Sequence, residues 1–302
     1  MRAAQSLQAA ASDIKLHHSV FALPFAVLGA CLAAVTPEGV PWGGMVWRLA
    51  VVVACMVFAR TAAMLANRLA DADIDARNAR TARRAIPSGR LSRRAATVML
   101  VASAAAFQLC TLAFPLAFGN PWPAWLAPPV LLWLLAYPFM KRFTWLCHAW
   151  LGASLAISVP AAALAMRPEA VDLAVVWWIA GMVLLWVTGF DVIYALQDVE
   201  TDRREGLFSM PARLGTGAAL VLSMAMHVGA LACLVQAWRA EPRLGAPFAI
   251  AVAVTAGLLV VEHATVRRWG TSRMALTFFT LNGCVSLLLG TAGVLGLVGI
   301  GR

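Results

Sequence analysis

The fold class is decided by residues 173–197, LAVVWWIAGMVLLWVTGFDVIYALQ. Asp191 is the one charged residue in this stretch, and the others are almost all apolar. A helix needs about 20 predominantly apolar residues to cross the hydrocarbon core of a bilayer. The stretch therefore predicts a transmembrane helix that ends in acidic residues.

Eight further apolar runs have bilayer length. They cover residues 19–36, 43–66, 95–118, 123–140, 146–166, 216–237, 246–263 and 275–299. The 302 residues are 62% hydrophobic and 13% charged, which excludes an ordinary soluble domain. The runs are also too long and too continuously apolar for barrel strands. We predict an all-α membrane protein, a bundle of about nine transmembrane helices. Residues 1–302 form a single membrane domain with two pseudo-repeated halves, about 15–140 and 145–299.

Basic residues set the expected orientation. The net charge is +10, but the Lys and Arg residues lie in short loops between apolar runs, which favours lipid headgroups or phosphorylated substrates over nucleic acid. With nine spans, 18 of them fall on one side of the membrane and four on the other. The positive-inside rule then predicts a multi-pass protein of the cell (inner) membrane, with a cytoplasmic N-terminus and an external C-terminus. The six cysteines all lie within apolar runs and are expected to be buried hydrophobic residues.

Acidic residues concentrate in two windows. Eight of the 14 lie in Asp71–Asp75 and Asp191–Glu205, both at predicted cytoplasmic span ends. If the helices continue, helical spacing groups two sets of side chains on one face each. The sets are Asn67, Asp71 and Asp75, and Asp191, Asp198 and Asp202. Because like charges at this spacing repel, the pattern indicates a cation between them.

The cation is expected to be hard. Neither window contains a His or Cys, and oxygen ligands suit Mg²⁺, which binds through one or two carboxylates, water and substrate phosphates. Arginines follow both windows, and carboxylates, metal and arginines together describe a diphosphate site at the membrane surface. The positive-inside rule would account for basic loops equally well by itself.

These motifs resemble a known family. The first is Asn67-Arg-x-x-Asp71-x-x-x-Asp75, followed by Arg80-Thr-x-x-Arg84 and Pro-Ser-Gly at 87–89. The second is Asp191-x-x-Tyr194-Ala-x-x-Asp198-x-x-x-Asp202, and Tyr137-Pro-x-x-Lys141-Arg lies between them. Together they are similar to the aspartate-rich motifs of the UbiA superfamily of intramembrane prenyltransferases. One departure is Ala85, where many members carry Pro.

The resemblance implies a site near the cytoplasmic face, covered by loops. Asn67, Asp71, Asp75, Asp198 and Asp202 would bind Mg²⁺, and Arg80, Arg84, Lys141 and Arg204 would contact the diphosphate. Asp191 and Tyr194 would complete the catalytic set. The faces of Tyr137 and Tyr194 could stabilise an allylic cation, although interfacial anchoring explains both tyrosines as well.

Arg60 lies inside an apolar span, where an unpaired arginine costs about 2.5–3.5 kcal/mol even on the lenient insertion scale. Family members resemble this chain in carrying Arg at this offset, so with Asn67 and Tyr137 it is expected to bind the carboxylate of an aromatic acceptor. The alternative is an ion pair with an internal aspartate such as Asp71. His17 and His18 could touch headgroups or the loop cap, whereas His148, His227 and His263 are expected at core or interface positions.

The predicted activity is Mg²⁺-dependent transfer of a polyprenyl group from its diphosphate to an aromatic acid, 4-hydroxybenzoate in ubiquinone biosynthesis. A carboxylated dihydroxynaphthoate of menaquinone biosynthesis is an alternative acceptor that Arg60 would serve equally. An ion-coupled membrane transporter is the alternative from another class, and its polar residues would be expected near the midplane of broken helices. The position of the acids at one membrane edge favours the enzyme.

Overall fold

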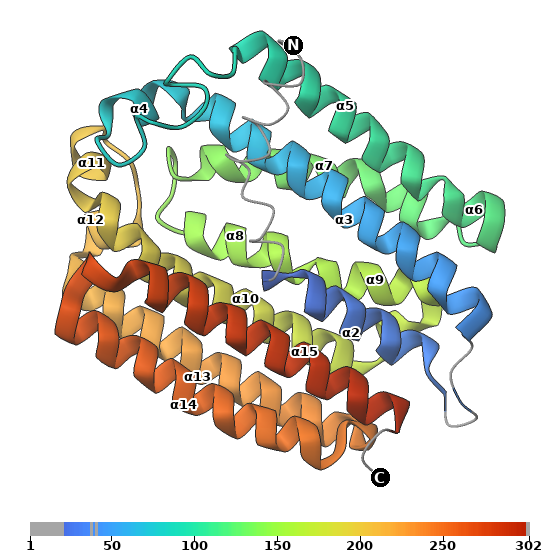
Figure 1. The fold of residues 1–302 in the computed structure, drawn as a ribbon. Helices are drawn as coiled ribbons and strands as arrows, with labels where there is room; N and C mark the ends of the chain where they lie inside the picture. Colours follow the sequence, from blue (N-terminus) through green and yellow to red (C-terminus); the bar gives the residue numbers. More distant parts are fainter. Residues whose placement is uncertain (1–20, 37–38, 40–41, 300–302) are drawn as a thin grey trace. The chain divides into compact units, whose positions relative to one another are not determined.

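The computed structural model describes residues 21–36, 39 and 42–299, and every regular element in this part is a helix (Figure 1). His17 and His18 lie outside the described residues. The α-helices are α2 (Leu23–Ala34), α3 (Trp42–Ala70), α4 (Ala72–Arg77), α5 (Arg93–Thr111), α6 (Ala113–Phe118), α7 (Trp122–Met140), α8 (Cys147–Ala156), α9 (Ser158–Met166), α10 (Ala174–Ala195), α11 (Val199–Arg204), α12 (Met210–Leu214), α13 (Thr216–Ala240), α14 (Gly245–Trp269) and α15 (Asn282–Val298). Short 3-10 turns η2 to η5 cover Pro168–Asp172, Leu196–Asp198, Pro242–Leu244 and Gly270–Arg273, and a π-helical segment η6 covers Ala275–Leu281.

The prediction of an all-α membrane bundle is confirmed. Within the described residues, eight helices are long and apolar enough to cross a bilayer. They correspond to eight of the nine predicted runs. The ninth run, 19–36, corresponds to α2, an apolar helix of 12 residues that adjoins the N-terminal part left undescribed. Many large apolar side chains are exposed on these helices, for example Leu116 and Leu132, as expected of surfaces that face lipid.

Proline explains two breaks within the predicted spans. Pro115 lies four residues after Thr111, where α5 ends, and Pro160 lies four residues after Ala156, where α8 ends. A proline ring clashes with the carbonyl group four residues earlier and has no N–H to donate. Each break therefore bends a single span, so the pairs α5–α6 and α8–α9 each count as one crossing.

The chain divides into two compact units. Among the described residues, the first unit comprises 51–143, and the second comprises 144–299 together with the chain before Val51. In the first unit α5 packs against α7. Its buried cluster contains Leu65 of α3, Ala72 of α4, and Ala85, Ile86 and Leu91 of the following loop. This cluster fastens the loop to the end of α3, which is where the first aspartate motif lies.

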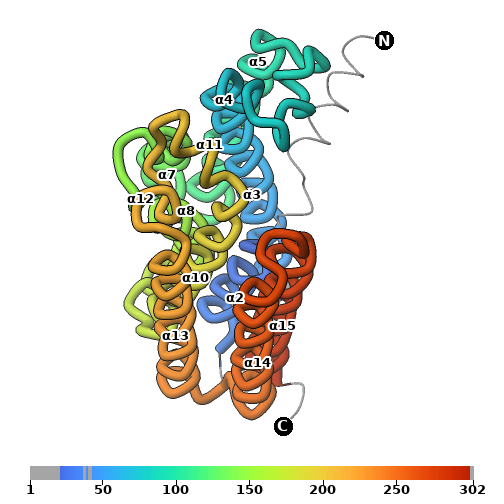
Figure 2. The backbone as a smooth tube through the Cα atoms, turned by 90° about the vertical axis from the view of Figure 1, so that its left-hand side faces the viewer, coloured from blue at the N-terminus to red at the C-terminus, as the bar shows by residue number. Residues whose placement is uncertain are grey.

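The second unit is built around α10. It packs most extensively against α13 and α8 (Figure 2), and α2 packs against α9 (Figure 1). Trp186, Ile179 and Val183 on α10 are at most 1% exposed. Small residues allow the close packing: a Cβ added at Gly152 of α8 would lie 2.4 Å from the Leu184 carbonyl oxygen on α10. This central helix carries the second aspartate motif at its C-terminal end.

Candidate active site

The first aspartate motif lies where α3 passes into α4. Asp71 leaves helical geometry, with φ −98° and ψ 2°, so α3 ends at Ala70. The backbone hydrogen bonds nevertheless continue: Asp71 N–H donates to the Asn67 carbonyl at 3.0 Å, and Asp75 N–H donates to the Asp71 carbonyl at 2.7 Å. Asp71 and Asp75 are both buried, at 3% and 5% exposure. The expected helical continuation of the motif thus holds, with one local distortion at Asp71.

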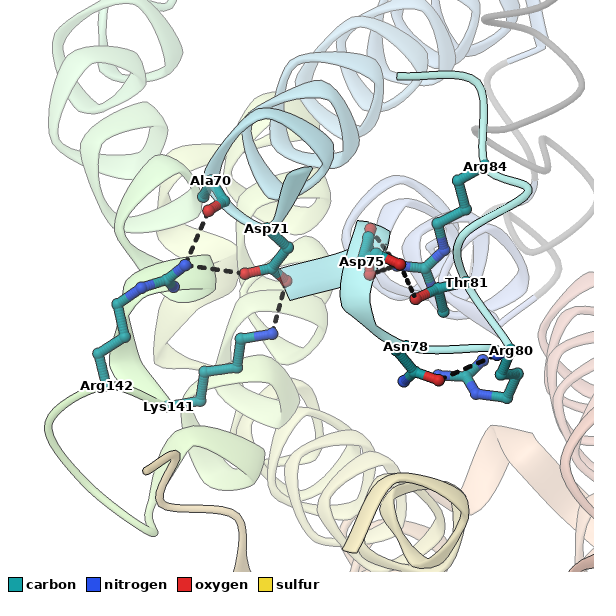
Figure 3. Close-up of polar contacts among 9 residues, drawn as sticks. All are labelled: Ala70, Asp71, Asp75, Asn78, Arg80, Thr81, Arg84, Lys141 and Arg142. Atoms are coloured by element: carbon teal, nitrogen blue, oxygen red, sulfur yellow. Dashed lines mark hydrogen bonds and ion pairs between the residues drawn. The ribbon is translucent and has the colours of Figure 1, made fainter. Parts of the chain in front are cut away.

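Three cationic side chains bind these two carboxylates (Figure 3). Lys141 Nζ donates to Asp71 Oδ2 at 2.5 Å, and Arg142 Nη2 donates to Asp71 Oδ1 at 3.0 Å. Arg84 Nη1 contacts Asp75 Oδ1 and Oδ2 at 2.8 and 2.7 Å. Arg142 also donates to the carbonyls of Ala70 and Pro138, both at 2.8 Å. The cluster carries two negative and three positive charges, and so has one positive charge in excess.

The chemistry of this cluster fits Mg²⁺ with a diphosphate. The ligand atoms are carboxylate oxygens, which hard cations prefer. The side chains of Arg84 and Lys141 are 21% and 28% exposed, whereas those of their carboxylate partners are 7% and 5% exposed. The cations therefore present accessible surface on which an anion could bind, while the carboxylates are held behind them. Phosphate oxygens bound to Lys and Arg form the short, charge-assisted hydrogen bonds of such sites.

Arg80 and Asn67 complete the predicted set in this part of the first unit. Arg80 is exposed on the loop after α4, where its backbone N–H donates to Asn78 Oδ1 at 3.0 Å. Asn67 is partly buried in the last turn of α3. The structure thus pairs Asp71 with Lys141 and Asp75 with Arg84, and keeps Arg80 on the neighbouring loop.

Arg60 is partly buried two turns before Asn67 on α3. Its Nε is buried without a hydrogen-bond partner in the described part of the chain. The alternative partner, Asp71, uses its carboxylate on Lys141 and Arg142 instead. Within the described residues, the Asp71 carboxylate is therefore bound by Lys141 and Arg142 rather than by Arg60.

The second motif lies at the end of α10 in the second unit. Asp191 and Tyr194 are in its last two turns, Asp198 ends the 3-10 turn, and Asp202 and Arg204 lie on α11. The 3-10 turn is a difference from the uninterrupted helix expected from the spacing. The Tyr194 ring packs on Phe278 with 4.3 Å between centroids, and Asp202 is buried while Arg204 is exposed.

His148 binds the first aspartate of this motif. Its Nδ1 lies 2.7 Å from Asp191 Oδ2, and the backbone N–H of Met210 donates to its Nε2 at 3.2 Å. The sequence reasoning missed this role because the two partners lie 43 and 62 residues away. It also left Arg142 out of the site, although its position beside Lys141 was a usable signal.

Within the described residues, no group of three or more His, Cys, Asp or Glu side chains is placed to hold a metal ion. A Mg²⁺ site made of one or two carboxylates, with water and phosphate oxygens in the remaining positions, does not require such a group. The fit to Mg²⁺ thus rests on the pairs of carboxylates and on the cations beside Asp71 and Asp75.

These features define a class: a multi-pass helical membrane protein with buried aspartates bound by Lys and Arg at the end of a span. A model of the UbiA prenyltransferase family matches residues 22–294. The chain belongs to this family and is a prenyl-transfer enzyme.

Individual relatives agree with this assignment. The 4-hydroxybenzoate octaprenyltransferase of Pseudomonas fluorescens is 32% identical over 210 residues, which cover 68% of this chain and 67% of the relative. The enzyme of the same name from Pseudomonas syringae pv. syringae is 34% identical, with 69% and 67% covered. Among solved structures, the apo structure of a UbiA homolog from Aeropyrum pernix superposes with a TM-score of 0.79 at 32% identity, over 92% of this chain and 97% of that chain. A UbiA homolog from Archaeoglobus fulgidus bound to GPP and Mg²⁺ shares the fold, with a TM-score of 0.66 at 15% identity, over 96% and 99%.

Proposed function

We propose that this protein transfers a polyprenyl group from polyprenyl diphosphate to the ring of 4-hydroxybenzoate in ubiquinone biosynthesis, in a reaction that requires Mg²⁺. The observation that carries the proposal is the cluster of Asp71 and Asp75 with Lys141, Arg142 and Arg84. It supplies metal-binding oxygens beside cations with accessible surface. The 4-hydroxybenzoate octaprenyltransferases among the relatives support this acceptor.

In the proposed reaction the allylic C–O bond of the substrate breaks, and the diphosphate leaves with the bonding electron pair. Asn67, Asp71, Asp75, Asp198 and Asp202 would hold Mg²⁺, which supplies a Lewis acid that neutralises the charge growing on the diphosphate. Arg80, Arg84, Lys141 and Arg204 would bind the remaining oxygens. Fixed cations stabilise this leaving group better than water does because they need no reorganisation.

A new bond then joins the allylic carbon to a ring carbon of the acceptor, and that ring carbon loses its proton. The faces of Tyr137 and Tyr194 would stabilise the allylic cation until the bond forms. We assign Asp191 as the proton acceptor because its contact at Oδ2 is with an imidazole rather than with Lys or Arg. Arg60 would bind the carboxylate of the acceptor and so set the position of the ring.

The test is a transfer assay with labelled polyprenyl diphosphate in membranes that contain this protein. We expect product with 4-hydroxybenzoate, and none after Mg²⁺ is removed with a chelator. Product only with a carboxylated dihydroxynaphthoate would reassign the acceptor to the menaquinone pathway. If folded protein yields no product with either acid, the proposed acceptor class is wrong.

A further inference from the structure

His148 sits in the first turn of α8 and uses both ring nitrogens. It is 4% exposed. Nδ1 contacts Asp191 Oδ2 on α10, and Nε2 accepts the backbone N–H of Met210 at the start of α12. The imidazole therefore connects three elements, two of which flank the second aspartate motif.

The contact with Met210 determines the tautomer. A backbone N–H can only donate, so Nε2 must carry a free lone pair and no proton. The ring proton is then on Nδ1, from which it is donated to the Asp191 carboxylate. This assignment satisfies both contacts with a neutral imidazole, whereas an imidazolium would set two N–H groups against each other at Nε2.

The same contacts hold the chain that follows Asp202. Cys147 Sγ donates a weak hydrogen bond to the Phe208 carbonyl at 3.9 Å, beside the contact between His148 and Met210. The Met210 side chain is fully buried in a cluster with Val192, the residue after Asp191. The loop after α11 is thus anchored on the first turn of α8.

Asp191 remains accessible while it is held. Its side chain is 21% exposed, against 5% for that of His148. His148, a buried donor, binds one carboxylate oxygen of Asp191, and the rest of the carboxylate is accessible to a substrate. This arrangement matches the way in which outer partners orient reactive groups.

We propose that His148 is a positioning residue for prenyl transfer: its Nδ1–H orients the Asp191 carboxylate, and its Nε2 fixes the loop before α12. The proposal rests on the proposed function, since Asp191 matters only if the chain catalyses that reaction.

Two conservative variants separate the two contacts. In His148→Asn the side-chain N–H₂ can replace Nδ1–H and donate to Asp191, but nothing accepts from Met210. In His148→Gln the side-chain oxygen can take the place of Nε2 and accept from Met210, while the donation to Asp191 is lost. Ser154→Ala, further along α8, is the control, because the Ser154 hydroxyl donates to the carbonyl of Trp150 in its own helix.

We expect His148→Gln to lower kcat by about 10–100-fold, the usual effect of losing an outer partner, with the KM for prenyl diphosphate within about twofold. His148→Asn should retain kcat within about threefold of wild type, and Ser154→Ala should behave as wild type. In the Asp191→Asn background, His148→Gln should cause no further loss. Equal losses in both His148 variants, or better activity in His148→Gln, would overturn the proposal and leave His148 as a loop anchor.

If His148→Gln does not fold, His148→Ala with added imidazole tests the same positioning role. We expect imidazole to raise the kcat of that variant, and folded protein that is not rescued would refute the positioning role. If the wild type itself transfers no prenyl group, the proposed function fails and this inference fails with it. If the wild type is active but His148→Asn and His148→Gln have the same kcat, the positioning role of His148 is wrong and the proposed function still stands.

Discussion

At the scale of single residues, two aspartates at the start of α4 have opposite surroundings. Asp71 is buried among Lys141 and Arg142, whereas Asp73, two positions on, is exposed and bound to Arg93 on the surface. A helix turns about 100° per residue, so neighbours two apart face different sides. Helical spacing explains this difference, because Asp73 lies off the face shared by Asp71 and Asp75.

This pair provides a matched test of the first motif. We expect Asp71→Asn to reduce turnover by at least about 100-fold, since it removes a proposed metal ligand and the negative charge that Lys141 and Arg142 bind. Asp73→Asn should stay within about twofold of wild type, because an exposed ion pair contributes little. Turnover is measured in membranes with labelled prenyl diphosphate, and folding is checked by size exclusion in detergent. Near-normal activity of Asp71→Asn would refute the assigned role.

Arg60 provides a second test at this scale. Arg60→Ala should raise the KM for a carboxylated acceptor by about 10–100-fold, the loss expected for a charge-assisted hydrogen bond. The KM for prenyl diphosphate should not change. Arg60→Lys keeps the charge but not the planar pair of donors, so its acceptor KM should lie between those of wild type and Arg60→Ala. An unchanged acceptor KM in Arg60→Ala would show that the arginine does not bind the acceptor.

At the scale of elements, a buried polar network joins three helices of the second unit. Trp186 Nε1 on α10 donates to Asn282 Oδ1 on α15 at 2.7 Å, and Asn282 Nδ2 donates to Glu262 Oε1 on α14 at 2.8 Å. Asn282 also donates to the Thr277 carbonyl in the π-helical segment at 3.1 Å. Asn282 is 0% exposed, so water cannot replace it as a hydrogen-bond partner of Trp186 and Glu262.

Asn282→Ala should therefore destabilise the protein. It leaves the Trp186 N–H and a Glu262 oxygen buried without partners, at a cost of about 1–3 kcal/mol for each unsatisfied group. We expect the melting temperature in detergent to fall by about 4–8 °C. Cys284→Ala, exposed on the same helix, is the control and should change it by no more than about 1 °C. Equal melting temperatures for the two variants would show that the network does not stabilise the bundle.

The ion pair in the turn between α13 and α14 predicts that the stability of the protein depends on pH. Burial alone would raise the pKa of Glu241, but hydrogen bonds from Arg243 and its charge lower that pKa below its ordinary value of 4.5. Arg243 also donates to the Val35 carbonyl at 2.6 Å, beyond the end of α2. Because the folded pKa lies below the unfolded one, the stabilisation is complete above the unfolded value and is lost as the pH falls through the folded value.

Glu241→Gln should accordingly melt about 2 °C below wild type at neutral pH, a modest shift because the pair is partly screened by solvent. The difference should shrink as the pH is lowered from about 5 towards the folded pKa. Thermal unfolding in detergent across this range measures it. A difference that is constant with pH would show that the effect does not come from ionisation.

At the scale of the whole molecule, the protein is a multi-pass membrane enzyme, and its basic residues predict an orientation. We propose an external C-terminus in the cell (inner) membrane, since the positive-inside rule places the 18 basic residues of one side in the cytoplasm. Alkaline phosphatase fused after Arg302 should be active, and the same reporter inserted after Ser88, within the loop between α4 and α5, should be inactive. The reverse pattern would invert the topology.

The membrane spans were predictable from the sequence alone, because the length and apolarity that a bilayer demands are local properties of the chain. The candidate site was predictable as far as its motifs went: Asp71, Asp75 and Asp191 stand out because acids are rare in so apolar a chain. Proline positions could also have located the breaks at Thr111 and Ala156.

The partners of these residues depended on packing. Asp71 binds Lys141 and Arg142 across about 70 positions, and Asp191 binds His148 across 43. Which side chain meets which is set by how helices pack and how far each turns, and periodicity within one helix carries no information about its neighbour. The sequence thus determines the spans and the chemistry of the acids, whereas the folded chain decides which cation or imidazole holds each of them.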